Sequence, residues 1–422
     1  MGSKLADSSP YMSALAGAAE GPYVGHLFLN VFGDDQPRMS GGRLIRAPCM
    51  PATLQHPRMT THPPTRKLCV AINWPAPRLQ RIRVSAAGTD TYEEMDGLSR
   101  LPAHGIDVSV LEASPQWLNP LFSRGSMLAG LDPWRLLRQL WHYRRYDVLV
   151  GIDSSSVLLF TWVKRLLRLR KPVVVIDPAL DAGYPRRMAL HRQVLPWAQH
   201  VVVYGTVQLE YLRGQFGDRV PASFIPHRID TDFFDPNRVT PSVGKEPYVF
   251  AVGNDVGRDF ETLVEACRGL PAQVVIHTKR KIQQPLPPNV TVRSDWVSFS
   301  GLRALYAGAR LVVMPLHDTV HASGINSLLE AMAMGRHVIV SASRGVRDYV
   351  RDGATATVVP TGDAAALHQA MRRHLADDAS SVRIGRQARQ TLVAEQSIDR
   401  YAKSVAQTLR SVARTGGCAV TL

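Results

Sequence analysis

The stretch 321–341 constrains the fold of this 422-residue chain more than any other part. Between Ile325 and Met332 the apolar residues recur at the spacing of one helical face. Gly335 suits the left-handed residue that ends a helix, and the following run, Val338–Val340, suits a strand buried on both faces of a parallel sheet. The stretch therefore predicts a loop, a helix and a parallel strand, which is the repeating unit of α/β proteins.

The same helix presents polar groups at its start. Ser323 and Gly324 open it, and free N–H groups together with the helix dipole favour a phosphate there. Asn326 and Glu330 lie one turn apart, away from the apolar stripe, where a carboxylate can hold a sugar hydroxyl. An ordinary α/β unit with a solvated glutamate fits the same residues, so this stretch alone leaves both interpretations open.

Composition narrows the class of protein. A chain of this length with 45% hydrophobic and 20% charged residues is typical of a globular protein with two domains. No apolar run approaches 18 residues, and no clear signal peptide is present, so the sequence predicts a cytoplasmic protein. The four cysteines lack metal-site spacing. The net charge of +15 allows nucleic acid, an anionic membrane or an anionic substrate as partner.

The order of strand-like and helix-like segments predicts two doubly wound, Rossmann-like α/β domains that face a cleft. Strands are expected at 68–72, 105–110, 146–151, 172–177, 200–204, 248–252, 273–276, 290–292, 311–314, 338–340 and 357–359. Helices are expected at 91–103, 133–146, 154–169, 206–216, 259–268, 364–375 and from about 398 to 413.

Proline-rich and polar stretches set the expected boundaries. Residues 1–66 are predicted to be a disordered extension, 67–234 the N-terminal domain and 235–247 a linker. Residues 248–396 form the expected C-terminal domain. Residues 397–422 form a helix and tail, and the helix is expected to be able to pack back on the N-terminal domain.

Four stretches in the second half occur in a characteristic order. They are IPHRIDTDFF at 225–234, FAVGNDVGRDFETLVEA at 250–266, SGINSLLEAMAMGRHVI at 323–339, and DG…VVPTGDAAAL between 352 and 367. This order resembles GT-B retaining glycosyltransferases of the glycosyl transferases group 1 type, over residues 225 to about 400. The resemblance implies a GT-B fold, a nucleotide-sugar donor, transfer with retention of configuration, and no metal or other cofactor.

The resemblance also implies site residues. Arg258 is placed to neutralise the donor pyrophosphate, and Glu330 is placed on the ribose hydroxyls. Lys279 or the adjacent Arg280 follows a strand, at the edge of the sheet where such ligands bind. The expected donor-binding residues are Arg258, Lys279, Ser323, Gly324, Ile325, Asn326 and Glu330.

The chain departs from the family pattern in several places, and two of them bear on the site. Many relatives carry a second glutamate eight residues before the one that matches Glu330, where this chain has Ala322. Relatives often have a histidine after an N-terminal-domain strand, and the comparable candidates here are Asp177 and Asp153, which serve equally well as helix caps. These two aspartates are the expected catalytic residues. His317 and His321 flank the donor motif, and both a loop role and a site role fit them.

The acceptor is expected to be a glycan, a lipid-linked sugar or a small molecule. Two helical segments, 134–146 and 164–170, mix arginine with apolar residues, which fits either an anionic membrane surface or a core helix with a solvated basic face. If the first interpretation holds, the protein associates peripherally with the inner face of the membrane. Nucleic acid is not expected, because no nucleic-acid motif accompanies the charge. A GT-B nucleotide-sugar epimerase and a non-catalytic GT-B partner protein are the alternatives.

Overall fold

The computed structural model describes residues 67–73, 97–111, 133–177, 180, 185–239, 247–395 and 398–415. The extension predicted for residues 1–66 lies outside the described residues, as does most of the predicted linker.

The first half of the described chain forms a six-stranded parallel sheet in the order β2-β1-β3-β4-β5-β6. Its strands are β1 (Leu68–Asn73), β2 (Ile106–Leu111), β3 (Val148–Ile152), β4 (Val173–Ile176), β5 (His200–Val203) and β6 (Ala222–Phe224). Valine and isoleucine dominate the central strands because both of their faces are buried. The order reverses between β1 and β3, and such a switch point is where open α/β sheets bind ligands, beyond the carboxyl ends of the strands.

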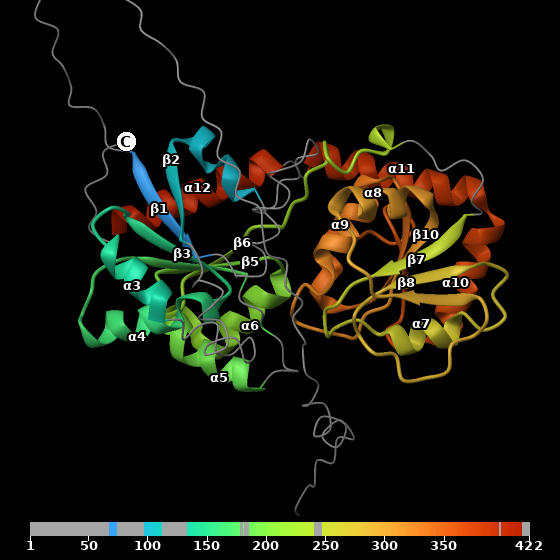
Figure 1. Cartoon of the computed structure of the whole chain (residues 1–422), viewed down its shortest axis with the longest axis horizontal. Coiled ribbons are helices and arrows are strands. Elements are labelled where there is room, and N and C mark those ends of the chain that lie inside the picture. Colours follow the sequence, from blue (N-terminus) through green and yellow to red (C-terminus); the bar gives the residue numbers. More distant parts are fainter. Residues whose placement is uncertain are drawn as a thin grey trace, which may run out of the picture. The chain divides into compact units, whose positions relative to one another are not determined.

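Helices cover both faces of this sheet (Figure 1). One face carries α3 (Pro133–Trp141), α4 (Leu158–Leu166), α5 (Pro185–Val194) and α6 (Thr206–Phe216), with the 3-10 turns η4 (Ser154–Val157), η5 (Leu195–Trp197) and η6 (Gly217–Arg219). The opposite face carries η1 (Leu98–His104) and the C-terminal helix α12 (Ile398–Thr415). The buried side of α12 includes Tyr401, Val405 and Leu409.

The second half forms another six-stranded parallel sheet, in the order β12-β11-β10-β7-β8-β9. The strands are β7 (Tyr248–Val252), β8 (Val274–His277), β9 (Val290–Arg293), β10 (Ala309–Met314), β11 (His337–Ser341) and β12 (Thr357–Val359). Helices α8 (Phe299–Gly308), α9 (Ile325–Ala333) and α11 (Asp378–Glu395) pack on one face, and α7 (Phe260–Ala266) and α10 (Ala364–Ala376) on the other. Two further 3-10 turns are η7 (Pro236–Arg238) and η8 (Arg344–Tyr349). Here the switch point lies between β7 and β10.

These sheets confirm the predicted fold class of two Rossmann-like units, with corrections to single elements. The helix predicted at 91–103 is a 3-10 turn over its described part, because Pro102 removes a backbone donor and glycines with positive φ, Gly97 and Gly105, bound it. The helix predicted at 133–146 ends at Trp141, and the one predicted at 154–169 begins with a 3-10 turn and ends at Leu166.

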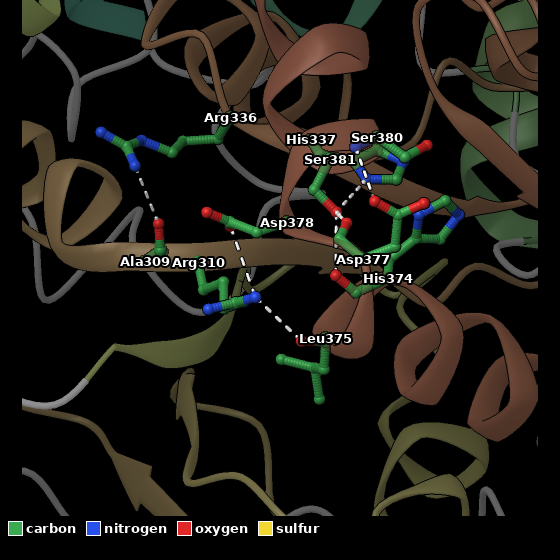
Figure 2. A network of polar contacts seen from close by, with 10 residues as sticks. All are labelled: Ala309, Arg310, Arg336, His337, His374, Leu375, Asp377, Asp378, Ser380 and Ser381. Carbon is green, nitrogen blue, oxygen red and sulfur yellow. Dashed lines mark hydrogen bonds and ion pairs between the residues drawn. The ribbon is translucent and has the colours of Figure 1, made fainter.

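A buried polar network anchors the start of β11 to the helices α10 and α11 (Figure 2). His337 Nδ1 lies 3.4 Å from Ser381 Oγ, and the hydroxyl of Ser381 donates to the carbonyl of His374 at 2.9 Å. Thr357 Oγ1 lies within 3.0 Å of both imidazoles. The two rings meet edge to face with centroids 4.3 Å apart. Burial, followed by the neighbouring His374 and Arg383, lowers the pKa of His337 to about 3, so the ring is neutral in the fold.

This network predicts acid-sensitive stability. The pKa of His337 is about 3 in the fold and about 6.5 in an unfolded chain. Below pH 6.5 His337 therefore binds a proton in the unfolded chain but not in the folded one. The free energy of unfolding falls as the pH drops towards 3. His337→Gln is expected to reduce the pH dependence of the free energy of unfolding by about 1 kcal/mol per pH unit between pH 6 and pH 4. Urea unfolding at several pH values measures it, with His142→Gln as the control, and equal slopes for the His337 variant and the parent chain would contradict the prediction.

Candidate active site

The helix α9 begins at a position that only glycine fills well. Gly324 is its N-cap, with a φ of 72°. A Cβ atom there would stand 2.8 Å from the guanidinium carbon of Arg258 and 2.9 Å from the Cε of Met314. Ile325, the first residue of α9, is buried, whereas Asn326 is exposed. The first-turn N–H groups of a helix lack partners within it, so this end of α9 offers backbone donors next to a buried cation.

Arg258 is that cation, and its side chain is only 1% exposed. Nη2 donates to Ser327 Oγ at 3.0 Å, while Nε and Nη1 have no hydrogen-bond partner among the described residues. Burial lowers the pKa of Arg258, and the charges of Asp255 and Glu330 oppose that effect. A buried guanidinium with two unsatisfied donors is costly unless an anion completes it.

The sequence places Arg258 at the switch point of the second sheet. Its backbone bridges to Leu316, directly after β10, and Gly253, directly after β7, lies against its guanidinium. A Cβ at Gly253 would stand 2.4 Å from Nε, so a side chain at that position would displace the arginine. The neighbouring N–H of Asp259 donates to the carbonyl of Pro315 at 3.0 Å, which fixes the loop that carries Arg258.

Glu330 is buried, at 5% exposed, and this corrects the expectation of a polar face shared with Asn326. Its Oε2 accepts from the hydroxyl of Tyr306 at 2.8 Å. Burial, followed by the charge and hydrogen bond of Glu330, raises the pKa of Tyr306 well above its ordinary value, so the phenol remains a donor. The sequence missed Tyr306 because α8, which carries it, was not predicted. The carboxylate is held beside Arg258 by a tyrosine from another helix.

A short loop after β7 holds the start of α9 in place. Asp255 Oδ1 accepts from the N–H of Gly257 at 2.7 Å and from the hydroxyl of Ser323. His321 Nε2 lies 3.7 Å from Asp255 Oδ2. Burial raises the pKa of Asp255, but His321 and these hydrogen bonds outweigh burial and keep it below its ordinary value. The Ser323 hydroxyl is therefore committed to Asp255, and the N–H groups of Ser323 and Ile325 donate to the carbonyls of His321 and Ala322 at 2.7 and 3.2 Å.

The two basic residues after β8 differ in their contacts. Arg280 Nη1 donates to the carbonyl of Asp255 at 3.1 Å, so this side chain braces the loop after β7. The backbone N–H of Lys279 donates to Asn254 Oδ1 at 2.6 Å, while its side chain is exposed. Lys279 makes no ion pair with any residue of the described ranges. Its ammonium group is available to an incoming anion.

The two predicted catalytic aspartates follow neighbouring strands of the first sheet. Asp153 comes directly after β3 with a φ of 68°, and Asp177 comes directly after β4 with a φ of 49°. Such conformations are strained for residues other than glycine, although aspartate and asparagine tolerate them best. The N–H of Asp153 donates to the carbonyl of Ile176, and that of Asp177 to the carbonyl of Val202, both at 2.9 Å. Both carboxylates therefore lie at the carboxyl edge of the sheet.

Unsatisfied polar atoms accompany these aspartates. Asp177 Oδ1 and Asn73 Oδ1 are buried without a hydrogen-bond partner among the described residues. His191 of α5, 1% exposed, approaches Asp153 with Nε2 at 3.8 Å from Oδ1. Asn73 ends β1 at the switch point of this sheet, and its Nδ2 donates to the carbonyl of Ser156 at 2.7 Å. Neither Asn73 nor His191 stands in a recognisable motif, so only the fold brings them to Asp153.

Arg258, Ser323, Gly324, Ile325 and Glu330 therefore meet at one end of the second sheet, with Lys279 exposed beside β8. Asp153 and Asp177 lie at the carboxyl edge of the first sheet. Within the described ranges no cluster of three or more histidine, cysteine, aspartate or glutamate side chains is arranged to hold a metal ion. No helix in that part of the chain is long and apolar enough to cross a membrane.

Known proteins resemble the chain in both sequence and fold. Residues 252–377 match the sequence profile of the family Glycosyl transferases group 1. The lipopolysaccharide core biosynthesis glycosyltransferase LpsE of Rhizobium meliloti (strain 1021) is 29% identical over 174 residues, which are 39% of this chain and 50% of LpsE. The match thus spans half the length of that relative.

Solved structures match over both sheets. Sucrose-phosphate synthase from Thermosynechococcus elongatus has a TM-score of 0.65 at 20% identity, covering 83% of this chain and 100% of the other. Anabaena HepE in complex with UDP-glucose has a TM-score of 0.61 at 12% identity, covering 82% and 100%. The chain has the two-sheet GT-B fold of these glycosyltransferase structures, and its second half carries the Glycosyl transferases group 1 sequence pattern.

Proposed function

We propose that this protein is a glycosyltransferase that moves a sugar from a nucleoside diphosphate donor to an acceptor hydroxyl. The observation that carries the proposal is Arg258, a buried guanidinium whose Nε and Nη1 lack partners in the described chain. It lies beside the N-terminal turn of α9, so two kinds of donor converge on one anion. A diphosphate supplies the charge and the several acceptor oxygens that such a site lacks.

The remaining groups have assigned places around the donor. Glu330, fixed by Tyr306, accepts hydrogen bonds from the ribose hydroxyls. Lys279 adds its charge at the phosphates from the exposed side, and the exposed Asn326 lies at the rim. The position of Ala322 carries no carboxylate, so backbone groups from Ser323 to Ile325 contact the sugar. HepE, which shares the fold, was solved with UDP-glucose, so UDP-sugars are the first donors to try.

We further propose transfer with retention of the anomeric configuration and without a metal ion. Arg258, Lys279 and the α9 N–H groups stabilise the departing diphosphate, which is the role a metal plays in other transferases. Asp153 and Asp177 lie on the acceptor side, where one of them positions or deprotonates the acceptor hydroxyl. The name of LpsE favours a glycan or lipid-linked acceptor. NMR of the product reports its configuration, and turnover in excess chelator tests the metal.

Donor binding is the first test of the proposal. Calorimetry with UDP-, GDP- and ADP-sugars is expected to detect one preferred nucleotide, and Glu330→Ala is expected to weaken it about 10- to 100-fold, since charge-assisted hydrogen bonds contribute about 1.5–3 kcal/mol. Glu261→Ala, an exposed glutamate in the first turn of α7, is the matched control.

Two results would count against this function. Absence of binding to every nucleotide sugar in the panel would contradict the donor site. Release of an epimerised sugar without any transfer to an acceptor would instead favour the GT-B epimerase.

A further inference from the structure

The helices α3 and α4 carry an apolar surface that no described residue covers. Trp134, Leu137 and Trp141 of α3 are 36%, 61% and 82% exposed. They recur at i, i+3 and i+7, and so share one face of the helix. A different face, with Leu136 and Leu140, packs on the core. The helix is therefore apolar on two sides, and one of them is in solvent.

The next elements extend this surface. Trp162 and Leu166 of α4 are 39% and 79% exposed, and Leu167 directly after the helix is 58% exposed. Trp197 of η5 is 40% exposed, and the guanidinium of Arg165 lies 4.9 Å from the centre of its ring. All these elements lie on the same face of the first sheet (Figure 1). We call the set Trp134, Leu137, Trp141, Trp162, Leu166, Leu167 and Trp197 the aromatic surface.

Arginine-rich segments carry much of the aromatic surface. Neither 133–146 nor 158–172 contains an aspartate or glutamate. The exposed arginines of these segments are Arg144, Arg145, Arg165, Arg168 and Arg170. By contrast, both lysines of these segments turn inward. Lys164 donates to Gln199 Oε1 at 2.7 Å, and burial lowers its pKa to about 8, while Lys171 donates to the carbonyl of Tyr146 at 2.5 Å. The charges that remain outside are guanidinium groups, which stay positive at every physiological pH.

We propose that the aromatic surface and its arginines dock on an anionic lipid bilayer. Tryptophan prefers the headgroup level of a bilayer, exposed leucine inserts below it, and arginine pairs with anionic lipid phosphates. A nucleic acid would use the arginines and could stack on tryptophan, but it offers nothing to Leu137, Leu166 and Leu167. A second copy of this chain would bring the same positive charge to the contact, which opposes self-association. The proposal does not depend on the transferase activity.

Vesicle sedimentation tests the docking surface. The full chain is expected to sediment with phosphatidylcholine vesicles that contain about one third phosphatidylglycerol, and much less with neutral vesicles. Trp141→Ala combined with Leu166→Ala is expected to reduce the bound fraction at least about fivefold. The matched control is Trp296→Ala, because Trp296 is 65% exposed on the second half of the chain. Equal partition onto neutral and anionic vesicles would overturn the proposal.

A charge series separates lipid docking from the other occupants. The triple replacement of Arg165, Arg168 and Arg170 by Gln is expected to reduce binding to anionic vesicles and the salt sensitivity of that binding. The control replaces the exposed Arg372, Arg373 and Arg386 of α10 and α11 by Gln and is expected to change neither. If both triple variants lose binding equally, net charge rather than this surface binds the vesicle. Light scattering without lipid tests for self-association. If the chain is a dimer and the Trp141 and Leu166 replacements dissociate it, this surface is a subunit interface and the lipid proposal is overturned.

Discussion

Replacing Arg258 with glutamine is expected to weaken binding of the preferred nucleoside diphosphate about 100-fold, which corresponds to about 3 kcal/mol. The side chain is buried, and its Nε and Nη1 have no partner in the described chain, so a bound diphosphate meets donors that are already desolvated and fixed. Lysine should recover only part of the loss, because an ammonium group cannot reproduce the forked donors of a guanidinium. Calorimetry with the free diphosphate measures the effect without turnover.

Two controls separate binding from folding in this experiment. Arg268→Gln removes an exposed arginine that pairs with Glu265 at 2.7 Å, and it should leave the dissociation constant unchanged. The corresponding nucleoside, which has no phosphates, should bind the Arg258 variant as it binds the parent chain, because the loss is specific to phosphate. Equal weakening of the nucleoside and the diphosphate would mean that Arg258 only maintains the fold.

Asp177→Asn is expected to lower turnover by about 10²–10⁴-fold, the usual contribution of a positioned acid or base. Asparagine tolerates a positive φ as well as aspartate does, so the variant keeps the backbone at 49° and removes only the charge. The effect should exceed that of Asp153→Asn, because Asp177 Oδ1 is buried without a hydrogen-bond partner among the described residues, whereas His191 Nε2 lies 3.8 Å from Asp153 Oδ1. Steady-state kinetics with the donor and acceptor identified by product analysis measures both.

The donor affinity distinguishes this role from a general disturbance. Both variants should bind the nucleoside diphosphate within about twofold of the parent chain, because each aspartate belongs to the first sheet and the donor contacts belong to the second. Asp107→Asn, at an exposed position of β2, is the control for substitution in the same sheet. Retention of near-normal turnover by Asp177→Asn and Asp153→Asn alike would remove both from the catalytic role.

Two helices that the sequence pattern did not predict, α8 and α11, each contain a glycine. The helix α11 contains Gly385, which normally weakens a helix interior. A Cβ there would stand 2.2 Å from the carbonyl oxygen of Gly335, so the glycine allows α11 to pack against the end of α9. The helix α8 likewise contains Gly301, although Ser298 caps it by accepting from the N–H of Gly301 at 3.0 Å. Close packing against the end of α9, which local propensity does not report, therefore decided the glycine of α11.

The sequence by itself determined the two parallel sheets, because strands buried on both faces must be runs of valine, isoleucine and leucine separated by helical segments. It also determined the start of α9, where Gly324 adopts the positive φ that the helix end and Arg258 require. Only the tertiary structure decided which polar groups of the site are hydrogen-bonded within the protein. It tied the Ser323 hydroxyl to Asp255, turned Glu330 towards Tyr306, and left Nε and Nη1 of Arg258 without partners in the described ranges. The reason is that burial and hydrogen-bond partners come from segments distant in the chain, and periodicity within one helix reports neither.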